Sequence, residues 1–447
     1  MAAPFDTVSA AGRAVPLYLL QSDKSGNLTS PEARDDLLAR IADGSLRDVY
    51  LFAHGWNNDF GESLDLFKRF FSGFLERRPA SATTDWKPVF VGLQWPSIVL
   101  VFPWEKGPKI AGANPAALDQ CFQQQAVSEI GNELGRVDAE RFAVLAVRAT
   151  LDKAEQRELV RLAHSAIAGG VPETANDVVP SEAELLASWR SLEHASKPAA
   201  PLSGDFGFAA EPGEAAPSTA PAGGPQAAGL FSALDPRNLV RGATVYLMKD
   251  RAGTIGAKAV RPVLEALVAG GAEVRLIGHS YGCRVVLAAL ATGEFQSPVR
   301  SALLLQPAVN QYCFAEAGRI PGTAGAGGFR RALDQVRLPI YSTFSPHDFP
   351  LHDTFHLALR RAKDLGEAEI AAGAPPSIYC ALGGYGPQGL ADGSGAALTI
   401  ADAGAFAYPP AARIVALDGA GERITSHGDV TNAFTCWALA EQDARAV

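Results

Sequence analysis

Short apolar runs that alternate with helical patterns are the feature of this sequence that most constrains its fold. The runs are short and mostly apolar, as in strands buried on both faces of a sheet. They occupy residues 14–21, 48–56, 87–97, 272–280, 300–308, 338–348 and 412–419. Strands that alternate with helices favour helices on both faces of the sheet. We therefore predict an α/β fold with a mainly parallel, doubly wound sheet.

The helical segments between the runs have clear local signals. In residues 57–78, large apolar side chains recur at helical spacing, which predicts one buried helix face (Leu64, Phe67, Phe70, Phe71 and Phe74). Residues 252–271 form another such pattern and end on a glycine pair suited to a C-terminal cap. A further helix is predicted to start at Ser181, because Glu184 stands three residues later in the capping-box position.

Residues 98–235 interrupt the alternation of strands and helices. A segment of this length is too long for a structureless loop in a compact domain, and it contains several helical patterns. Within it, residues 196–229 are so rich in Pro, Ala and Gly that we expect a flexible tether. We predict an α/β core formed by residues 1–97 and 236–447, with the interrupting segment inserted as a helical cap.

Composition and charge exclude several classes of protein. The 447 residues have a formal net charge of −9, so no overall positive field attracts nucleic acid or anionic lipid. No apolar run reaches the ~18 residues of a membrane span, and the N-terminal run is too short for a secretion signal. The five cysteines are far apart without a CxxC pair, which favours buried thiols. We expect a cytoplasmic protein without a nucleic-acid partner or a stable membrane anchor.

One serine stands between two glycines where an apolar run changes into a helical pattern. Gly278, Ser280 and Gly282 fit GxSxG, in which a strand turns sharply into a helix and exposes the serine above the sheet. The pattern alone has many chance matches. Here the apolar residues "VRLI" precede it and "CRVVLAAL" follows it, so strand, turn and helix are all present. We predict that Ser280 is a nucleophile.

A serine hydroxyl needs a base to accept its proton and a carboxylate to orient that base. Asp348 follows the apolar run at 338–348, where the tip of the strand should face the serine. The competitor is Asp353, which lies past Pro350 and is expected in the first turn of a helix. We favour Asp348 as the acid, and the alternative is an ordinary turn residue.

Four histidines follow the serine, and one of them has the required position. His427 lies between the last predicted strand and the last predicted helix, so we assign it as the base. His347 is adjacent to the predicted acid and should point away from it. His352 and His356 are spaced to share a helix face and could hold a metal, but no third histidine or cysteine ligand is spaced to complete the site. We therefore expect no metal.

An oxyanion also needs hydrogen-bond donors. His54, Gly55 and Trp56 end a strand and enter a helix, so the backbone N–H of Trp56 could point to the same place as that of Tyr281. Glycine followed by two asparagines also forms an ordinary turn and N-cap. The position of the motif before the insertion favours the oxyanion hole.

With "HGW", "GHSYG", an aspartate at a strand end and a late histidine in this order, the chain resembles the α/β-hydrolase superfamily; the stretches "PLYLLQSDKSG", "FAHGWNND", "LMKDRAG" and "GHSYGCRV" carry a narrower resemblance. They are similar to a bacterial group with largely unassigned substrates. The resemblance covers roughly residues 14–100 and 235–440. It implies a triad of Ser280, Asp348 and His427. It does not indicate a substrate, because this fold hosts many activities.

Our prediction is a serine hydrolase that cleaves small-molecule carboxylic esters through an acyl-enzyme, without a metal or organic cofactor. A lipase or serine peptidase with the insertion as a lid is the first alternative, and a non-catalytic binding module is the second. The oligomeric state stays open. Lys249, Asp250 and Arg251 stand just before the helical pattern at 252–271. We interpret them as a salt-bridged corner, with recognition of a substrate anion as the alternative.

Overall fold

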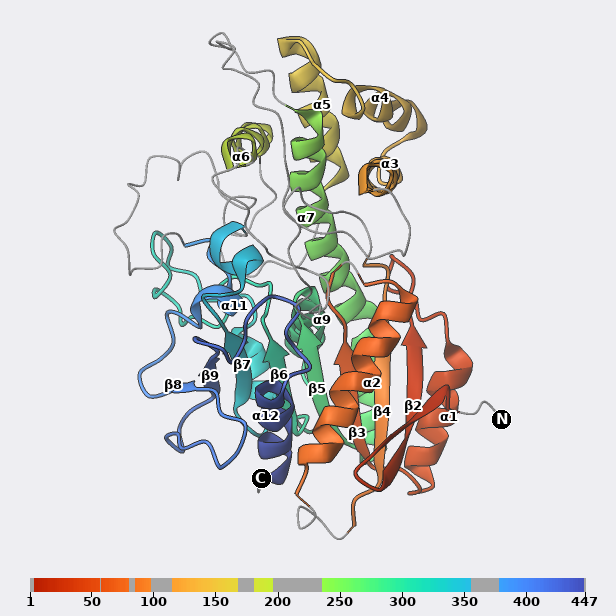
Figure 1. Ribbon diagram of the computed structural model, residues 1–447, viewed down its shortest axis with the longest axis vertical. Coiled ribbons are helices and arrows are strands. Elements are labelled where there is room, and N and C mark those ends of the chain that lie inside the picture. Colours follow the sequence, from red (N-terminus) through yellow and green to blue (C-terminus); the bar gives the residue numbers. More distant parts are fainter. Residues whose placement is uncertain are drawn as a thin grey trace, which may run out of the picture.

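A nine-stranded sheet forms the centre of the computed structural model (Figure 1). The structure describes residues 4–56, 58–79, 85–97, 115–167, 181–195, 235–354 and 378–445. The strands are β1 (Asp6–Ala10), β2 (Arg13–Gln21), β3 (Asp48–Ala53), β4 (Pro88–Gln94), β5 (Glu273–His279), β6 (Ser301–Leu305), β7 (Ile340–Phe344), β8 (Gly395–Thr399) and β9 (Ile414–Asp418). Their order is β1-β2-β4-β3-β5-β6-β7-β9-β8. β1 and β2 are antiparallel and the other neighbouring pairs of this sheet are parallel, which confirms the predicted α/β class.

The seven predicted strands correspond to β2–β7 and β9, and the two strands at the sheet edges were not predicted. β1 joins β2 through a tight turn at Ala11 and Gly12, which both have positive φ. β8 is a half-exposed "GAALT" segment beside β9. Edge strands lose the continuous apolar pattern of central strands because one side and part of their faces meet solvent.

Helices cover both faces of the sheet because successive strand side chains point in opposite directions. In β3, Val49 and Leu51 belong to one core and Tyr50 and Phe52 to the other. The first core packs under α1, α8 and α9, and the second packs under α2 and α12. The elements are α1 (Pro31–Ala42), α2 (Phe60–Arg77), α8 (Arg261–Ala269), α9 (Tyr281–Ala291), the 3-10 helix η2 (Arg330–Gln335), the π-helical turn η3 (Pro350–Thr354), α11 (Leu382–Tyr385) and α12 (Ala433–Ala444).

Helix α2 and the capping box at Ser181 confirm two local predictions. The predicted apolar face of α2 is buried at Phe67, Phe70, Phe71 and Phe74, whereas Leu64 is half-buried. At the other site, the Ser181 backbone N–H donates to Glu184 Oε2 at 2.7 Å, and the Glu184 N–H donates to Ser181 Oγ at 3.3 Å.

The interrupting segment contributes helices that pack around α7. They are α3 (Pro115–Gly131), α4 (Arg136–Ala146), α5 (Lys153–Ala166) and α6 (Glu182–Ala195), and each contacts α7 (Pro236–Ile255). The buried Trp189 of α6 also donates to the carbonyl of Asp235, the N-cap residue of α7. Figure 1 shows this group above the sheet, with α7 running from it down to the strands. α7 then continues through the π-helical turn η1 (Gly256–Val260) into α8. The predicted tether at 196–229 lies outside the described residues.

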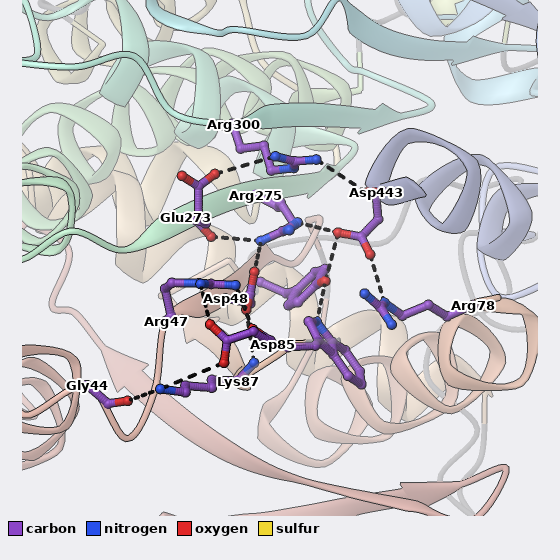
Figure 2. A network of polar contacts seen from close by, with 12 residues as sticks. Gly44, Arg47, Asp48, Arg78, Asp85, Lys87, Glu273, Arg275, Arg300 and Asp443 are labelled. Carbon is purple, nitrogen blue, oxygen red and sulfur yellow. Dashed lines mark hydrogen bonds and ion pairs between the residues drawn. The ribbon is translucent and has the colours of Figure 1, made fainter. Parts of the chain in front are cut away.

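A buried ion network joins the chain's last helix to the sheet at the ends where β3 and β5 begin (Figure 2). The Asp443 carboxylate on α12 accepts from Arg78 Nε at 2.8 Å and from the Tyr50 hydroxyl at 2.9 Å, and it also pairs with Arg275. Arg275 pairs in turn with Asp48 at 3.2 Å. These charges are almost fully buried, so each depends on its partners for the interactions that water would supply.

None of the helices in the described part of the chain combines the length and apolar character that a membrane crossing requires. Four of the five cysteines fall on described side chains, and all four are buried free thiols, as predicted. They are Cys283, Cys313, Cys380 and Cys436.

Candidate active site

Ser280 occupies a strained turn between β5 and α9. Its φ of 54° and ψ of −124° are unusual for a residue with a side chain, and such strain persists only where the surroundings enforce it. The two flanking glycines explain how the turn fits. A Cβ on Gly282 would lie 2.0 Å from the Ala53 carbonyl oxygen, and one on Gly278 would lie 2.7 Å from the Cys283 backbone. The sharp turn predicted from GxSxG is therefore present.

His427 and Asp348 form a buried pair at the same sheet edge. Asp348 follows β7, and His427 lies between β9 and α12. His427 Nδ1 lies 2.8 Å from Asp348 Oδ2 and 3.0 Å from Oδ1. The Leu351 backbone N–H also donates to Oδ1 at 3.1 Å. An ionised carboxylate only accepts hydrogen bonds, so it favours the tautomer of a neutral imidazole that carries its proton on Nδ1.

His279 links the turn that bears Ser280 to the loop that bears His427. His279 directly precedes Ser280, and its ring lies 5.0 Å from the His427 ring, centroid to centroid. His279 Nε2 is 3.0 Å from the His427 carbonyl oxygen. The structure thus brings the three residues of the predicted triad to one edge of the sheet, although they lie on three separate segments.

The other candidate acid and bases have different surroundings. His347 is exposed, unlike its buried neighbour Asp348. His352 stacks on Tyr385 with ring centroids 4.4 Å apart. His356 and the side chain of Asp353 lie outside the described residues. Among the side chains that are described, no group of three or more His, Cys, Asp or Glu is arranged to hold a metal ion.

The segment predicted to supply an oxyanion donor packs directly against the serine. A Cβ on Gly55 would lie 2.9 Å from Ser280 Cβ and 2.8 Å from His279 Nδ1, so only glycine allows this close approach. The rings of Trp56 and Tyr281, the two residues whose N–H groups were predicted to act, lie 5.7 Å apart. The Tyr281 N–H is in the first turn of α9, where backbone donors have no acceptor within their own helix.

His54 fixes the orientation of the neighbouring peptide group. The Trp95 backbone N–H donates to His54 Nε2 at 3.3 Å, so Nδ1 carries the proton and donates to the Gly55 carbonyl at 2.8 Å. Burial lowers the pKa of His54 to about 4, which keeps this ring neutral. Because the N–H and C=O of a trans peptide point in opposite directions, holding the Gly55 carbonyl also aims the Trp56 N–H. This role of His54 was not predicted from the sequence.

Ser345 and Gln306 also contact the histidine loop, and the sequence analysis missed both. Ser345 Oγ donates to the Ile424 carbonyl at 2.8 Å, which ties the loop of Asp348 to the loop of His427. Gln306 directly follows β6 and donates from its side chain into the same loop. The sequence did contain a signal for Gln306, because this polar residue comes immediately after a buried apolar run, at the end of a strand.

The three charged residues of "LMKDRAG" lie within α7, which begins earlier than the predicted helix. Arg251 is buried and donates to the Pro96 carbonyl at 3.2 Å and to Glu129 at 2.7 Å, and so joins α7 to β4 and α3. The Lys249 carbonyl accepts from Arg284 Nε at 2.6 Å. Arg251 therefore forms a salt bridge, as predicted, but it lies within a helix and not at a corner before one.

No family model, curated protein or solved structure matches this chain. Evidence for what the chain does therefore comes from the geometry of the site itself. That geometry combines a strained serine, an imidazole oriented by a carboxylate, and a loop whose Gly55 packs closely against the serine. Such a combination can activate a hydroxyl group and hold a developing oxyanion.

Proposed function

We propose that this protein is a serine hydrolase of the α/β-hydrolase fold that cleaves small-molecule carboxylic esters. The single observation that supports this most strongly is the buried His427–Asp348 pair at 2.8 Å beside the strained turn at Ser280. The order nucleophile, acid, base along the chain and the strand–turn–helix around the serine agree with that superfamily. A triad in this arrangement is hard to explain by packing alone.

In the proposed reaction, His427 Nε2 accepts the Ser280 proton while the serine oxygen attacks the ester carbonyl carbon. The carbonyl electrons move onto its oxygen, which the backbone N–H groups of Trp56 and Tyr281 stabilise by about 3 kcal/mol each. His427 then gives the proton to the leaving alcohol, and an acyl-enzyme remains. Water, deprotonated by His427, attacks the acyl-enzyme, and the carboxylic acid leaves as Ser280 recovers its proton.

Asp348 has an orienting and electrostatic role in this scheme. It accepts from His427 Nδ1, and so keeps the lone pair on Nε2 and stabilises the imidazolium formed in each half-reaction. His54 keeps the Trp56 N–H aimed while remaining uncharged. No step of the scheme requires a cofactor.

Labelling by a fluorophosphonate probe, combined with turnover of p-nitrophenyl esters, tests the proposal. We expect wild-type protein to react with both and Ser280→Ala to lose both while its unfolding free energy stays close to that of wild type. Ester turnover by folded Ser280→Ala would contradict the proposal. A folded wild-type protein that is never labelled would instead favour a binding module. A series of acyl chain lengths, run beside peptide substrates, separates esterase from lipase and peptidase activity.

A further inference from the structure

The backbone carbonyl of His427 is held by two side chains that the proposed reaction does not use. Its oxygen accepts from Gln306 Nε2 at 2.9 Å and lies 3.0 Å from His279 Nε2. A carbonyl oxygen only accepts hydrogen bonds, so His279 carries its proton on Nε2 and donates as well. The donors come from the carboxyl ends of the neighbouring strands β5 and β6, and both are buried.

The backbone conformation of Gln306 is unusual and is fixed by a hydrogen bond of its own. Its φ of 41° is in the left-handed region that favours glycine, and its N–H donates to Thr343 Oγ1 at 2.8 Å. The same carboxamide nitrogen also donates to the Ser426 carbonyl at 2.7 Å, so it spans two successive peptide groups of the histidine loop. A residue kept in a strained conformation at a site is a common sign that its placement matters there.

His279 suits its position because it stays uncharged. Burial, followed by the neighbouring His427, lowers the pKa of His279 to about 3. When His427 becomes an imidazolium during the proposed reaction, a charged ring 5.0 Å away would oppose it. A neutral imidazole can hold the carbonyl without that repulsion.

We infer that Gln306 and His279 are positioning residues, which hold the base in place by its own backbone carbonyl. This inference rests on the proposed function, because it concerns the base of that reaction. Asp348 orients the imidazole of His427 through Nδ1. Gln306 and His279 hold the main chain of the same residue through its carbonyl. Together they leave the ring little freedom to turn away from Ser280, and loss of such control costs turnover more than substrate binding.

The chain offers a matched control for Gln306. Gln442 on α12 is also a fully buried glutamine whose Nε2 donates to two backbone carbonyls, those of Ala302 at 3.1 Å and Pro339 at 2.8 Å. Those carbonyls lie at the beginnings of β6 and β7, at the opposite end of the sheet from His427. Replacement of either glutamine by methionine removes the two hydrogen bonds that its own Nε2 donates to backbone carbonyls, with little change in side-chain length.

The experiment compares Gln306→Met, Gln442→Met and His279→Phe with the wild type in ester turnover and urea unfolding. We expect both glutamine variants to lose similar stability. Only Gln306→Met should lower kcat, by about 10²-fold, with little change in KM. His279→Phe should lower kcat in the same way, and it keeps the test valid if Gln306→Met does not fold. The proton NMR signal of His427 Nδ1–H should broaden by exchange in both active-site variants and stay sharp in Gln442→Met.

Two outcomes would overturn the inference. One is a kcat for both Gln306→Met and His279→Phe equal to that of Gln442→Met, together with an unchanged Nδ1–H signal. The other is an equal fall of kcat in Gln442→Met, which would show a general effect of lost stability. Failure of the proposed function would be seen in a different experiment, as ester turnover by folded Ser280→Ala. The NMR signal then still reports whether the two donors position His427.

Discussion

His427 and Asp348 are 79 positions apart in the chain, yet the imidazole Nδ1 and the carboxylate Oδ2 lie 2.8 Å apart. They meet because β7 and β9 are parallel neighbours, so the loops that follow the two strands leave the sheet at the same edge. The bond from Ser345 Oγ to the Ile424 carbonyl then fixes one loop to the other. The sheet and the contact between the two loops therefore hold these two side chains together.

Replacement of Asp348 should abolish most of the turnover. Asp348→Asn would place an amide beside His427 Nδ1 and favour the wrong tautomer, which lowers kcat by about 10⁴-fold in this kind of triad. Asp353→Asn, the competitor from the sequence, should keep most of the activity. Steady-state ester kinetics of the two variants decide between them. Collapse of kcat in Asp353→Asn with a near-normal Asp348→Asn would show that the acid was wrongly assigned.

Buried neutral histidines should make the fold sensitive to mild acid. The pKa values of His54 and His279 are lowered to about 4 and about 3, so these rings stay neutral in the fold where unfolded histidine, with a pKa near 6.5, takes up a proton. Their contribution to the unfolding free energy is fully present above the unfolded pKa near 6.5, and it is lost as the pH falls toward the pKa values in the fold. In this window, each histidine should lower the unfolding free energy by about 1.4 kcal/mol for each unit by which the pH falls.

Urea unfolding of the wild type and of His279→Phe between pH 7.5 and pH 4.5 measures this effect, with pH values chosen to bracket the histidine range. Below about pH 6 the unfolding free energy of the variant should fall less steeply with decreasing pH than that of the wild type. The difference in slope should correspond to the uptake of about one proton on unfolding. Parallel curves for the two proteins would mean that His279 is protonated in the fold, and they would contradict the neutral donor described above.

The buried ion network predicts a loss of stability that leaves the chemistry intact. Asp443→Asn would leave Arg78 and Arg275 buried without their shared carboxylate, which should lower the unfolding free energy by about 3–5 kcal/mol. Turnover per folded molecule should change little, because Asp48 and Arg275 lie near the beginnings of β3 and β5, whereas Ser280 follows the end of β5. Thermal or urea unfolding, with kinetics at low temperature, measures both quantities.

The half-exposed pair of Lys24 and Glu133 provides the control for that prediction. Their charged atoms lie 3.3 Å apart near solvent, so Glu133→Gln should change stability by about 1 kcal/mol or less. Equal effects of Asp443→Asn and Glu133→Gln would show that the buried carboxylate is not a major source of stability in this fold.

Much of the central architecture was predictable because its signals are local. The apolar runs specify strands buried on both faces, and the aromatic spacing in α2 specifies one helix face. Ser280 was recognisable because the steric demands of the turn place glycine on either side of it. The edge strands β1 and β8 were not predictable in the same way, since half-exposed strands need no continuous apolar run.

The sequence by itself determined the parallel α/β layout, the sharp turn at Ser280 and the order in which Asp348 and His427 follow it. Only the tertiary structure decided how these groups are held. Gln306 and His279 meet the His427 carbonyl, and His54 turns the Gly55 peptide, through hydrogen bonds to backbone atoms. Every residue offers the same backbone carbonyl, so residue types say nothing about which one a side chain reaches. Strand order and loop closure make that choice.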